Sequence, residues 1–446
     1  MTKKLFAISL SLALLFTGCS DTDNSSDKQK SSSDINSPIE SSVNAESNPN
    51  IIFATALETT AKAEEIMDLD NQVNPDGYNI VDEIGDCYVG YTSKCIVEGE
   101  LYEQIPKLIN SKTKKEVPIK YPQGYPTDSK SNGSYVVMND RYIYQWVYSP
   151  IKPVTQLTSY KLLLTCLDVS TGTMTIKNTV TTYISDVKLC KYNDSSFLSY
   201  YSMPTSVDDS NPSYLSVLEV YDTKGGHKEI LRESVSWDKR KPDDNSKLHT
   251  EFCVNEGLIY AYGQTYFRPT MERYIDQYDI NGNLIGSIDN TDNLFNIDFL
   301  KGTMPNRMNV NGNYLTFTGE DANYRRQFIY EIKNGKLNTI AESTDSYQLF
   351  YSVANNNNKQ LTPYILLTKK SIANASFDDN YIVYCFDTIS GKNKSFDFTT
   401  FSEFPYFEFK FLSNGDVLFS YCEQSYNPPE VKQILLSADK LAELMK

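Results

Sequence analysis

Two short patterns of apolar and polar residues alternate along the chain. In the first, an apolar or aromatic stretch ends at an acidic residue, and a glycine follows three or four positions later. Its copies end at Asp168, Asp222, Asp279, Glu331 and Asp387, so successive acids lie 54, 57, 52 and 56 residues apart. The β-forming residues predict a strand, the acid begins a turn, and the glycine supplies a positive φ angle. The pattern therefore predicts a recurring β-hairpin.

The second pattern is a polar turn that precedes an alternating aromatic strand, and it falls in the other half of each period. Its seven copies begin near Gly85, Asn139, Asn193, Asn255, Asn311, Asn358 and Asn414. Both series therefore share a period of about 55 residues. Two hairpins in each period predict repeating units of four strands.

A repeat of this length with four strands is typical of a β-propeller blade. We predict an all-β fold in which residues 70–446 form a β-propeller, with seven four-stranded blades. Six or eight blades remain alternatives because the terminal copies are weak. A pair of β-sandwiches would not explain the even spacing. The pattern resembles β-propellers of the WD-repeat, kelch and TolB-like kind, but no motif of any one of these subfamilies recurs.

Residues 51–69 interrupt the repeat. The stretch from Ala54 to Leu69 contains many helix-forming residues, with apolar positions near helical spacing at Leu57, Ala61, Ile66 and Met67. We predict a short N-terminal helix here. The alternative is that residues 51–54 add a closing strand to the last blade, which would protect the edges of the propeller.

The N-terminus has the organisation of an export signal. Lys3 and Lys4 precede an apolar run, residues 5–16, which is too short to span a bilayer. Small residues then lead to Cys19, and this resembles the lipobox of bacterial lipoproteins. The resemblance implies a signal peptide over residues 1–18 and lipid attachment at Cys19. An ordinary cleaved signal is the alternative.

Residues 19–50 begin at that cysteine and continue as a serine-rich stretch with almost no apolar residue. Such a segment cannot offset its ordering entropy by burial, so we expect a disordered tether. The lipid would hold the protein at the cell membrane or outer membrane, facing outside the cytoplasm.

Composition narrows the partners and the chemistry. The formal charge is −15, from 57 acidic and 42 basic residues, which argues against a nucleic-acid partner. The two histidines, His227 and His249, fall near turns and are interpreted as solvated loop residues. A partial match to a calcium-binding loop begins at Gln72, but its first position lacks the usual aspartate, so a plain turn is favoured. We expect no metal and no cofactor.

The cysteines admit two interpretations. In an exported chain they could form disulfides, and Cys87 with Cys95 is the candidate pair because the two could face each other across a hairpin. The alternative, which we prefer, is that the cysteines are small buried apolar residues.

No convincing catalytic constellation is present in the sequence. The favoured hypothesis is a lipid-anchored binding or scaffold protein that presents its propeller to an envelope protein, a peptide or a glycan. Four tyrosines predicted to lie in loops could stack on such ligands: Tyr121, Tyr125, Tyr266 and Tyr426. The alternative is a propeller-type glycoside hydrolase or lyase that acts on polysaccharide, with carboxylates at the centre of the ring.

Overall fold

The computed structural model describes most of the chain from residue 61 to residue 446. The ranges outside the description are 1–60, 69–70, 76, 98–100, 127–129, 151–158, 184–185, 207–212, 237–246, 266–272, 289–304, 312–313, 321–324, 334–335, 343–347, 356–362, 372–379, 402–405 and 423–430. Cys19, the signal peptide and the serine-rich segment therefore lie outside the described residues. No helix among the described residues is long and apolar enough to cross a membrane.

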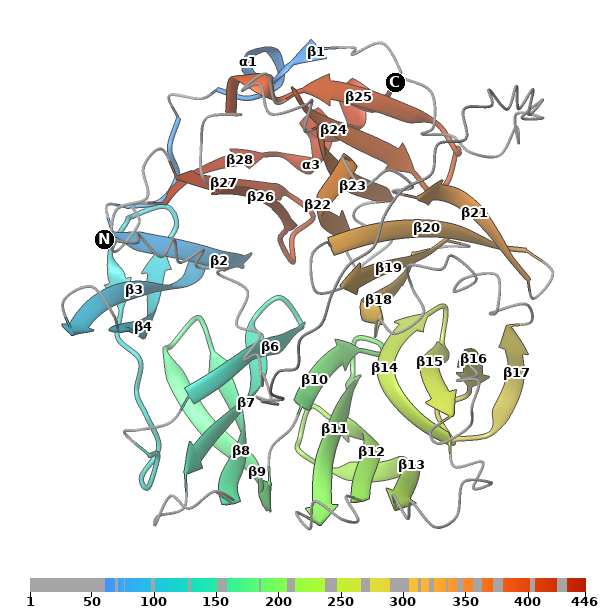
Figure 1. Ribbon diagram of the computed structural model, residues 1–446. Coiled ribbons are helices and arrows are strands. Elements are labelled where there is room, and N and C mark those ends of the chain that lie inside the picture. Colours follow the sequence, from blue (N-terminus) through green and yellow to red (C-terminus); the bar gives the residue numbers. More distant parts are fainter. Residues whose placement is uncertain are drawn as a thin grey trace, which may run out of the picture.

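The strands form a β-propeller, in which separate sheets follow one another around a centre (Figure 1). The first three blades are β2(78–84)-β3(87–97)-β4(101–110)-β5(116–117), β6(130–138)-β7(142–150)-β8(159–168)-β9(173–183) and β10(186–191)-β11(196–206)-β12(213–222)-β13(227–236). Blades 4 and 5 are β14(247–255)-β15(258–265)-β16(273–278)-β17(284–288) and β18(305–311)-β19(314–320)-β20(325–333)-β21(336–342). Blade 6 is β22(348–355)-β23(364–371)-β24(380–387)-β25(393–397), and the C-terminal sheet is β26(406–411)-β27(417–422)-β28(432–436).

The two sequence patterns are the two hairpins of each blade. The acidic pattern forms the turn between the third and fourth strands at Asp168, Asp222, Asp279 and Asp387, whose side chains accept hydrogen bonds from backbone N–H groups of the turn. The glycines of these four turns have φ between 68° and 96°, a region that glycine adopts without strain. The polar pattern forms the turn between the first and second strands, as at Asn139 and Asn193. The predicted strand period is confirmed.

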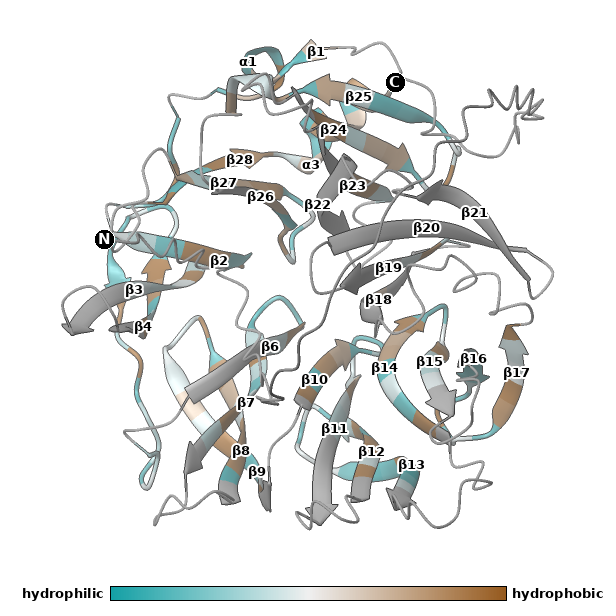
Figure 2. Cartoon of the chain, viewed as in Figure 1, coloured by the Kyte–Doolittle hydropathy of each residue, from teal (hydrophilic) through white to brown (hydrophobic). Residues whose placement is uncertain are grey.

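The apolar core lies between neighbouring sheets. One cluster joins blades 2 and 3 through residues such as Trp146 and Phe197, and another joins blade 1 to the C-terminal sheet through Ile80 and Leu418. Apolar residues recur along strands of successive sheets, for example on β24 and β27 (Figure 2). Because these described clusters lie between neighbouring sheets, the sheets that they join depend on each other for stability.

The prediction of seven four-stranded blades is wrong. Six sheets have four or more strands among the described residues, and the last repeat forms only the three-stranded C-terminal sheet. After β28 the chain turns into helix α3 (Ala438–Met445), so no fourth strand follows. Ser437 caps this helix by accepting a hydrogen bond from the backbone N–H of Lys440. Leu441 and Met445 bury the apolar side of the helix, which explains why a helix ends the chain.

Of the predicted N-terminal segment, residues 51–69, the structure describes only residues 61–68. Within the described part, the only helix is α1 (Ala63–Ile66), a single turn, and a two-residue strand, β1 (Ala61–Lys62), precedes it. β1 pairs in parallel with β25, so it extends blade 6 to five strands and does not complete the last sheet. Residues 51–54, the proposed closing strand, lie outside the described residues. Ala63 and Ile66 pack into the same core as Leu441, which holds α1 in place.

The ring closes through side-chain hydrogen bonds between its two ends. Asn74, just before blade 1, donates from Nδ2 to the carbonyl oxygens of Val431 (2.8 Å) and Tyr78 (2.9 Å), and its Oδ1 accepts from the backbone N–H of Gln433 (2.9 Å). The Gln433 side chain accepts from the N–H of Ile80 (2.6 Å) and donates to its carbonyl oxygen (2.9 Å). Both polar side chains are buried, so these bonds satisfy groups that water cannot reach.

We expect Asn74→Ala to destabilise the protein by about 2–4 kcal/mol, because it leaves two carbonyl groups and one N–H group buried without their partner. The measurement is the shift of the thermal and urea unfolding midpoints. The control is Asn283→Ala, which removes an exposed side chain bound to Asp279 within one hairpin and should cost less than about 1 kcal/mol. Equal effects of the two substitutions would contradict the assigned role of Asn74 in ring closure.

Candidate functional site

Polar side chains from three innermost strands meet at the centre of the ring. β2, β6 and β26 are the first strands of blade 1, blade 2 and the C-terminal sheet, and they lie near the centre (Figure 1). Asp82 on β2, Tyr135 on β6, Lys410 on β26 and Ser413 after β26 contact one another. These four residues are called the Asp82 cluster below. Lys410 and Tyr135 touch although blade 1 separates their sheets along the ring, so they meet on its inner side.

Asp82 occupies a position that the strand pattern reserves for apolar residues. Tyr78, Ile80 and Ile84 share its buried face of β2, and Asp82 itself is 2% exposed. Its carboxylate accepts four hydrogen bonds: from the backbone N–H groups of Glu83 and Ser413 (both 2.8 Å), the Ser413 hydroxyl (2.7 Å) and the Tyr135 hydroxyl (2.9 Å). These donors compensate the cost of burying the charge. Asp82 therefore links three sheets at the ring centre.

Tyr135 lies between Asp82 and Lys410. Its hydroxyl donates to Asp82 and accepts from Lys410 Nζ at 3.1 Å, and Nζ also lies 5.2 Å from the centre of the Tyr135 ring. Burial and the Asp82 carboxylate raise the pKa of Tyr135 well above its usual value. The hydroxyl therefore stays protonated at neutral pH and holds the lysine amine in place.

A second charged contact joins the innermost strands of blades 3 and 4. Lys188 on β10 forms an ion pair with Glu251 on β14, and Glu251 is 5% exposed. The pair places opposite charges together, so neither charge is left buried alone. The ion pair joins two blades, as Asp82 joins blade 1 to its neighbours.

His249 is the centre of a buried group of charges between blades 3 and 4. The interpretation of His249 as a solvated loop residue is wrong, because it lies on β14 and is 1% exposed. Its Nδ1 lies 2.8 Å from Glu233 Oε1 on β13, and its Nε2 lies 3.3 Å from Asp276 Oδ2 on β16. The Ser287 hydroxyl donates to the other oxygen of Asp276 at 2.5 Å. Each ring nitrogen thus faces a carboxylate oxygen, an arrangement that suits the doubly protonated imidazolium.

The pKa of His249 is raised by this environment. Burial lowers it, but hydrogen bonds to Asp276 and Glu233, together with the charges of these two carboxylates, outweigh burial. In the imidazolium form both nitrogens donate, and the ring then has no lone pair for a metal or for a general base. The group is therefore an ionic contact between blades, and no cluster of three or more potential metal ligands occurs among the described residues.

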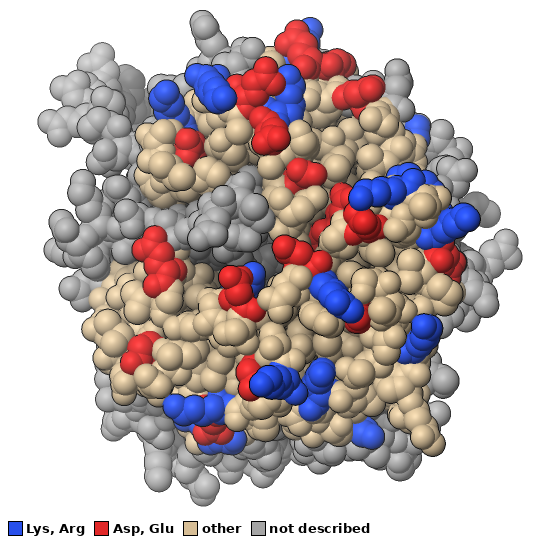
Figure 3. Space-filling view, turned by 180° about the vertical axis from the view of Figure 1, so that it is seen from behind, with Lys and Arg blue, Asp and Glu red and all other residues tan. Residues whose placement is uncertain are grey.

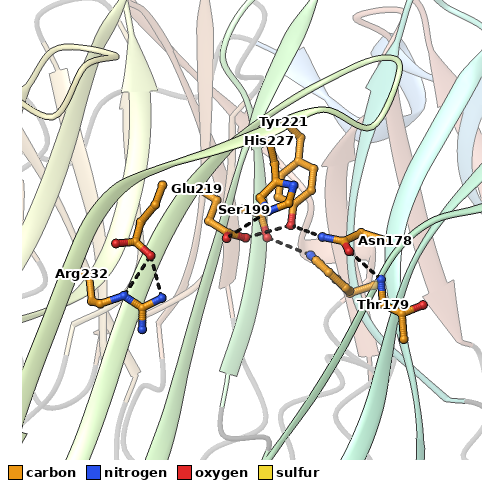
Figure 4. A network of polar contacts seen from close by, with 9 residues as sticks. Asn178, Thr179, Ser199, Glu219, Tyr221, His227 and Arg232 are labelled. Atoms are coloured by element: carbon orange, nitrogen blue, oxygen red, sulfur yellow. Dashed lines mark hydrogen bonds and ion pairs between the residues drawn. The ribbon is translucent and has the colours of Figure 1, made fainter.

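His227, the other histidine, belongs to a polar network between blades 2 and 3 (Figure 4). Its ring stacks on Tyr221 at 5.1 Å, and its Nε2 lies 3.9 Å from Glu219. The Tyr221 hydroxyl donates to Glu219 (2.8 Å) and accepts from Asn178 (2.9 Å). Burial and the Glu219 charge raise the pKa of Tyr221, so it also stays protonated. The network connects side chains from β9, β12 and β13.

The structure does not support the candidate disulfide. Cys87 and Cys95 lie on the same strand, β3, eight positions apart, which corresponds to about 26 Å along the strand. A disulfide needs Cα atoms within about 7 Å. Cys87 is a free, buried thiol, and Cys166, Cys190, Cys385 and Cys422 are also free. The pair was expected to face each other across a hairpin, but the turn between the partner strands comes only after Val97.

Two of the four predicted loop tyrosines come together. Tyr121 and Tyr125 follow β5, and their ring centres lie 4.8 Å apart at an angle of 38°. Tyr121 is 48% exposed, and Tyr125 is partly exposed. The backbone between them turns through a hydrogen bond from the Tyr125 N–H to the Pro122 carbonyl. Tyr266 and Tyr426 lie outside the described residues. The partial match to a calcium-binding loop that begins at Gln72 includes Asn74, whose side chain binds Val431 and Gln433 at the ring closure.

Charge is distributed without a large area of one sign on the face seen in Figure 3, where acidic and basic side chains are interspersed. The excess of acidic residues in the chain therefore does not collect there into a single patch.

Comparison with known proteins identifies no family and no activity for this chain. No protein-family model matches the chain, and no curated protein sequence matches it. An oligogalacturonate lyase from Vibrio parahaemolyticus is 10% identical with a TM-score of 0.45, over 81% of this chain and 92% of that one. The β-propeller domain of the trilobed protease from Pyrococcus furiosus is 10% identical with a TM-score of 0.35, over 73% and 96%.

A putative 6-phosphogluconolactonase from Bacteroides uniformis is 12% identical with a TM-score of 0.40, over 73% of this chain and 88% of that one. These structural neighbours are propeller enzymes. At such low identity and TM-scores they carry no inference about the activity of this chain.

We expect His249→Gln to destabilise the protein more at about pH 6 than at about pH 9. A folded-state pKa raised above 6.5 means that protonation contributes stability that is complete at low pH and is lost as the pH rises through the folded value. The measurement is the difference in unfolding midpoint between wild type and variant across that pH series. His227→Gln at the partly exposed network is the matched control, and a pH-independent difference for His249→Gln would refute the ionic role.

Proposed function

We propose that this chain is a lipid-anchored binding protein that holds its propeller outside the cytoplasm and presents it to a protein, peptide or glycan of the cell envelope. The observation that carries this proposal is that four buried or partly buried carboxylates are already bound by other groups of the chain. Asp82, Glu233, Glu251 and Asp276 each contact a cation or hydrogen-bond donors of the chain itself.

This engagement bears on catalysis because glycoside hydrolysis needs two carboxyl groups aimed at the substrate. One must deliver a proton and the other must act as a base or nucleophile. Asp82 accepts four hydrogen bonds and joins three sheets, while Glu233 and Asp276 hold the two nitrogens of His249. These carboxylates stabilise contacts between sheets and are not directed at a substrate. This supports binding over hydrolysis for the described part of the chain.

The pair Tyr121 and Tyr125 supplies the surface for that binding. Two adjacent, partly exposed rings offer apolar area and hydroxyl groups at a low entropic cost. Sugar rings and the side chains of peptides both stack on such surfaces. The segment is held in place by hydrogen bonds of the Lys120 backbone to Gly172 (2.8 Å) and Met174 (3.1 Å), so the rings are presented from a fixed backbone.

The binding proposal predicts that Tyr121→Ala/Tyr125→Ala weakens ligand binding about tenfold or more, with little loss of stability, because stacking surface is removed at an exposed loop. The measurement is binding of the full-length protein to arrays of envelope glycans and peptides, followed by titration of each hit. Leu284→Ala/Ile285→Ala, which removes exposed apolar side chains on β17, is the control.

The same protein is assayed for turnover of polysaccharides. Robust hydrolysis or elimination would overturn the binding proposal in favour of a propeller-type glycoside hydrolase or lyase. Equal affinity of the tyrosine variant and the control variant for a confirmed ligand would remove Tyr121 and Tyr125 from the site.

Lipid attachment predicts that Cys19→Ala abolishes incorporation of a labelled fatty acid and releases the protein from the membrane fraction, because no thiol remains to accept the lipid. The measurement is metabolic labelling in the native host followed by fractionation. Cys87→Ala, which changes a buried thiol, should retain the label. Unchanged labelling of Cys19→Ala would contradict the anchor.

A further inference from the structure

Lys410 differs from the other partly buried lysine at the ring centre. Lys188 is neutralised directly by Glu251. Among the described residues, Lys410 has no carboxylate within ion-pair distance, and its one hydrogen-bond partner is the Tyr135 hydroxyl. An ammonium group has three donors, so this contact uses one of them.

The surroundings of Lys410 favour the neutral amine. Burial lowers its pKa, and the charges of Asp82 and Glu408 offset this only in part, so the pKa lies below the usual value for lysine. A larger fraction of the side chain is therefore unprotonated at neutral pH than for a lysine in water. Unprotonated amines are the nucleophiles of lysine chemistry.

The amine is also held in one place. Glu408 and Lys410 share one face of β26, whereas Phe409 and Phe411 anchor the opposite face in the core. Tyr135 is fixed in turn by its hydrogen bond to Asp82, which is bound by Ser413. Lys410 remains partly exposed. A positioned, partly exposed and partly neutral amine is the arrangement that covalent chemistry with a carbonyl group requires.

We propose that Lys410 is a reactive amine at the ring centre that forms a reversible imine with a carbonyl-bearing ligand, such as the open-chain aldehyde of a reducing sugar. The nitrogen lone pair attacks the carbonyl carbon, and the C=O π electrons move to oxygen. The carbinolamine then loses water, which takes the carbonyl oxygen and both amine hydrogens, and a C=N bond remains. No oxidant or reductant is needed.

A neutral carbonyl ligand fits this site better than an anion does. Asp82 and Glu408 both act on Lys410 electrostatically, so these two carboxylates would repel a negatively charged ligand beside the amine. The inference goes beyond the proposed binding function and does not depend on it, because the surface tyrosines and Lys410 are different sites.

The experiment is reductive labelling of the full-length protein with benzaldehyde and cyanoborohydride over a pH series, with the modified peptides quantified by mass spectrometry. We expect Lys410 to be labelled about tenfold faster at neutral pH than Lys394 and Lys440, with half-maximal labelling at a lower pH. Lys394 is the matched internal control because it is partly buried and donates to the Leu444 carbonyl, and Lys440 is the control in a helix. Labelling of Lys410 that is no faster than that of both controls would overturn the proposal.

Tyr135→Phe separates a positioned amine from one that is merely exposed. The substitution removes the hydroxyl that holds Nζ but keeps the ring, so the rate at Lys410 should change at least about threefold while the rate at Lys394 stays constant. Circular dichroism and the unfolding midpoint check the fold of the variant. An unchanged rate in folded Tyr135→Phe would count against positioning by Tyr135. Labelling at Lys410 in a protein that binds no glycan or peptide would support the amine site and count against the proposed function.

Discussion

The whole structure depends on closing a ring without a covalent bond between its ends. Asn74 Oδ1 accepts a hydrogen bond from the backbone N–H of Gln433, 359 positions away, and the Gln433 side-chain amide bonds with the backbone of Ile80. Blade 1 and the C-terminal sheet bury apolar residues against each other, so an open ring would expose these residues of both. Just before blade 1, Gln72 forms an antiparallel bridge with Ile434 on β28, and the Val73 N–H donates to the Gln433 carbonyl oxygen. The two buried amide side chains lie at this contact. An amide serves this position well because it offers a donor and an acceptor together.

The charged residues inside the ring also join separate sheets. Asp82 gathers donors from three sheets, Lys188 and Glu251 join blades 3 and 4, and His249 is held between Glu233 and Asp276. Buried charges such as these are costly unless they are paired, and paired charges fix the relative position of their elements through geometry. The blades are otherwise joined by apolar contacts, which are non-directional. Packing therefore supplies most of the stability of the ring, and the polar contacts fix how neighbouring blades are positioned relative to each other.

Lys410 stands apart because Tyr135 separates it from Asp82. The tyrosine accepts a hydrogen bond from the amine and gives one to the carboxylate, so the two charges are linked without direct contact. This leaves the amine less stabilised as a cation than Lys188 is. Both lysines lie on innermost strands, so what distinguishes them is the partner: a carboxylate for Lys188 and a tyrosine hydroxyl for Lys410.

The sequence by itself determined the local structure. Hairpins at Asp168 and Asp222 follow from acid-then-glycine turns in which the carboxylate binds backbone N–H groups two to four residues ahead, an interaction contained within a few residues. Their regular spacing was enough to predict a propeller. Asp82 carried a signal of its own, since it interrupts a row of apolar residues on β2.

Only the tertiary structure decided how the repeats end and which polar residues meet. The C-terminal sheet has three strands because α3 follows β28, and Cys87 and Cys95 share one strand because β3 continues to Val97. His249 looked like a turn residue, but Glu233 and Asp276 reach it from two other strands. These partners lie 16 and 27 residues from His249 in the sequence, so the residues next to His249 do not reveal them. Their contact with His249 is set by the packing of one sheet on the next.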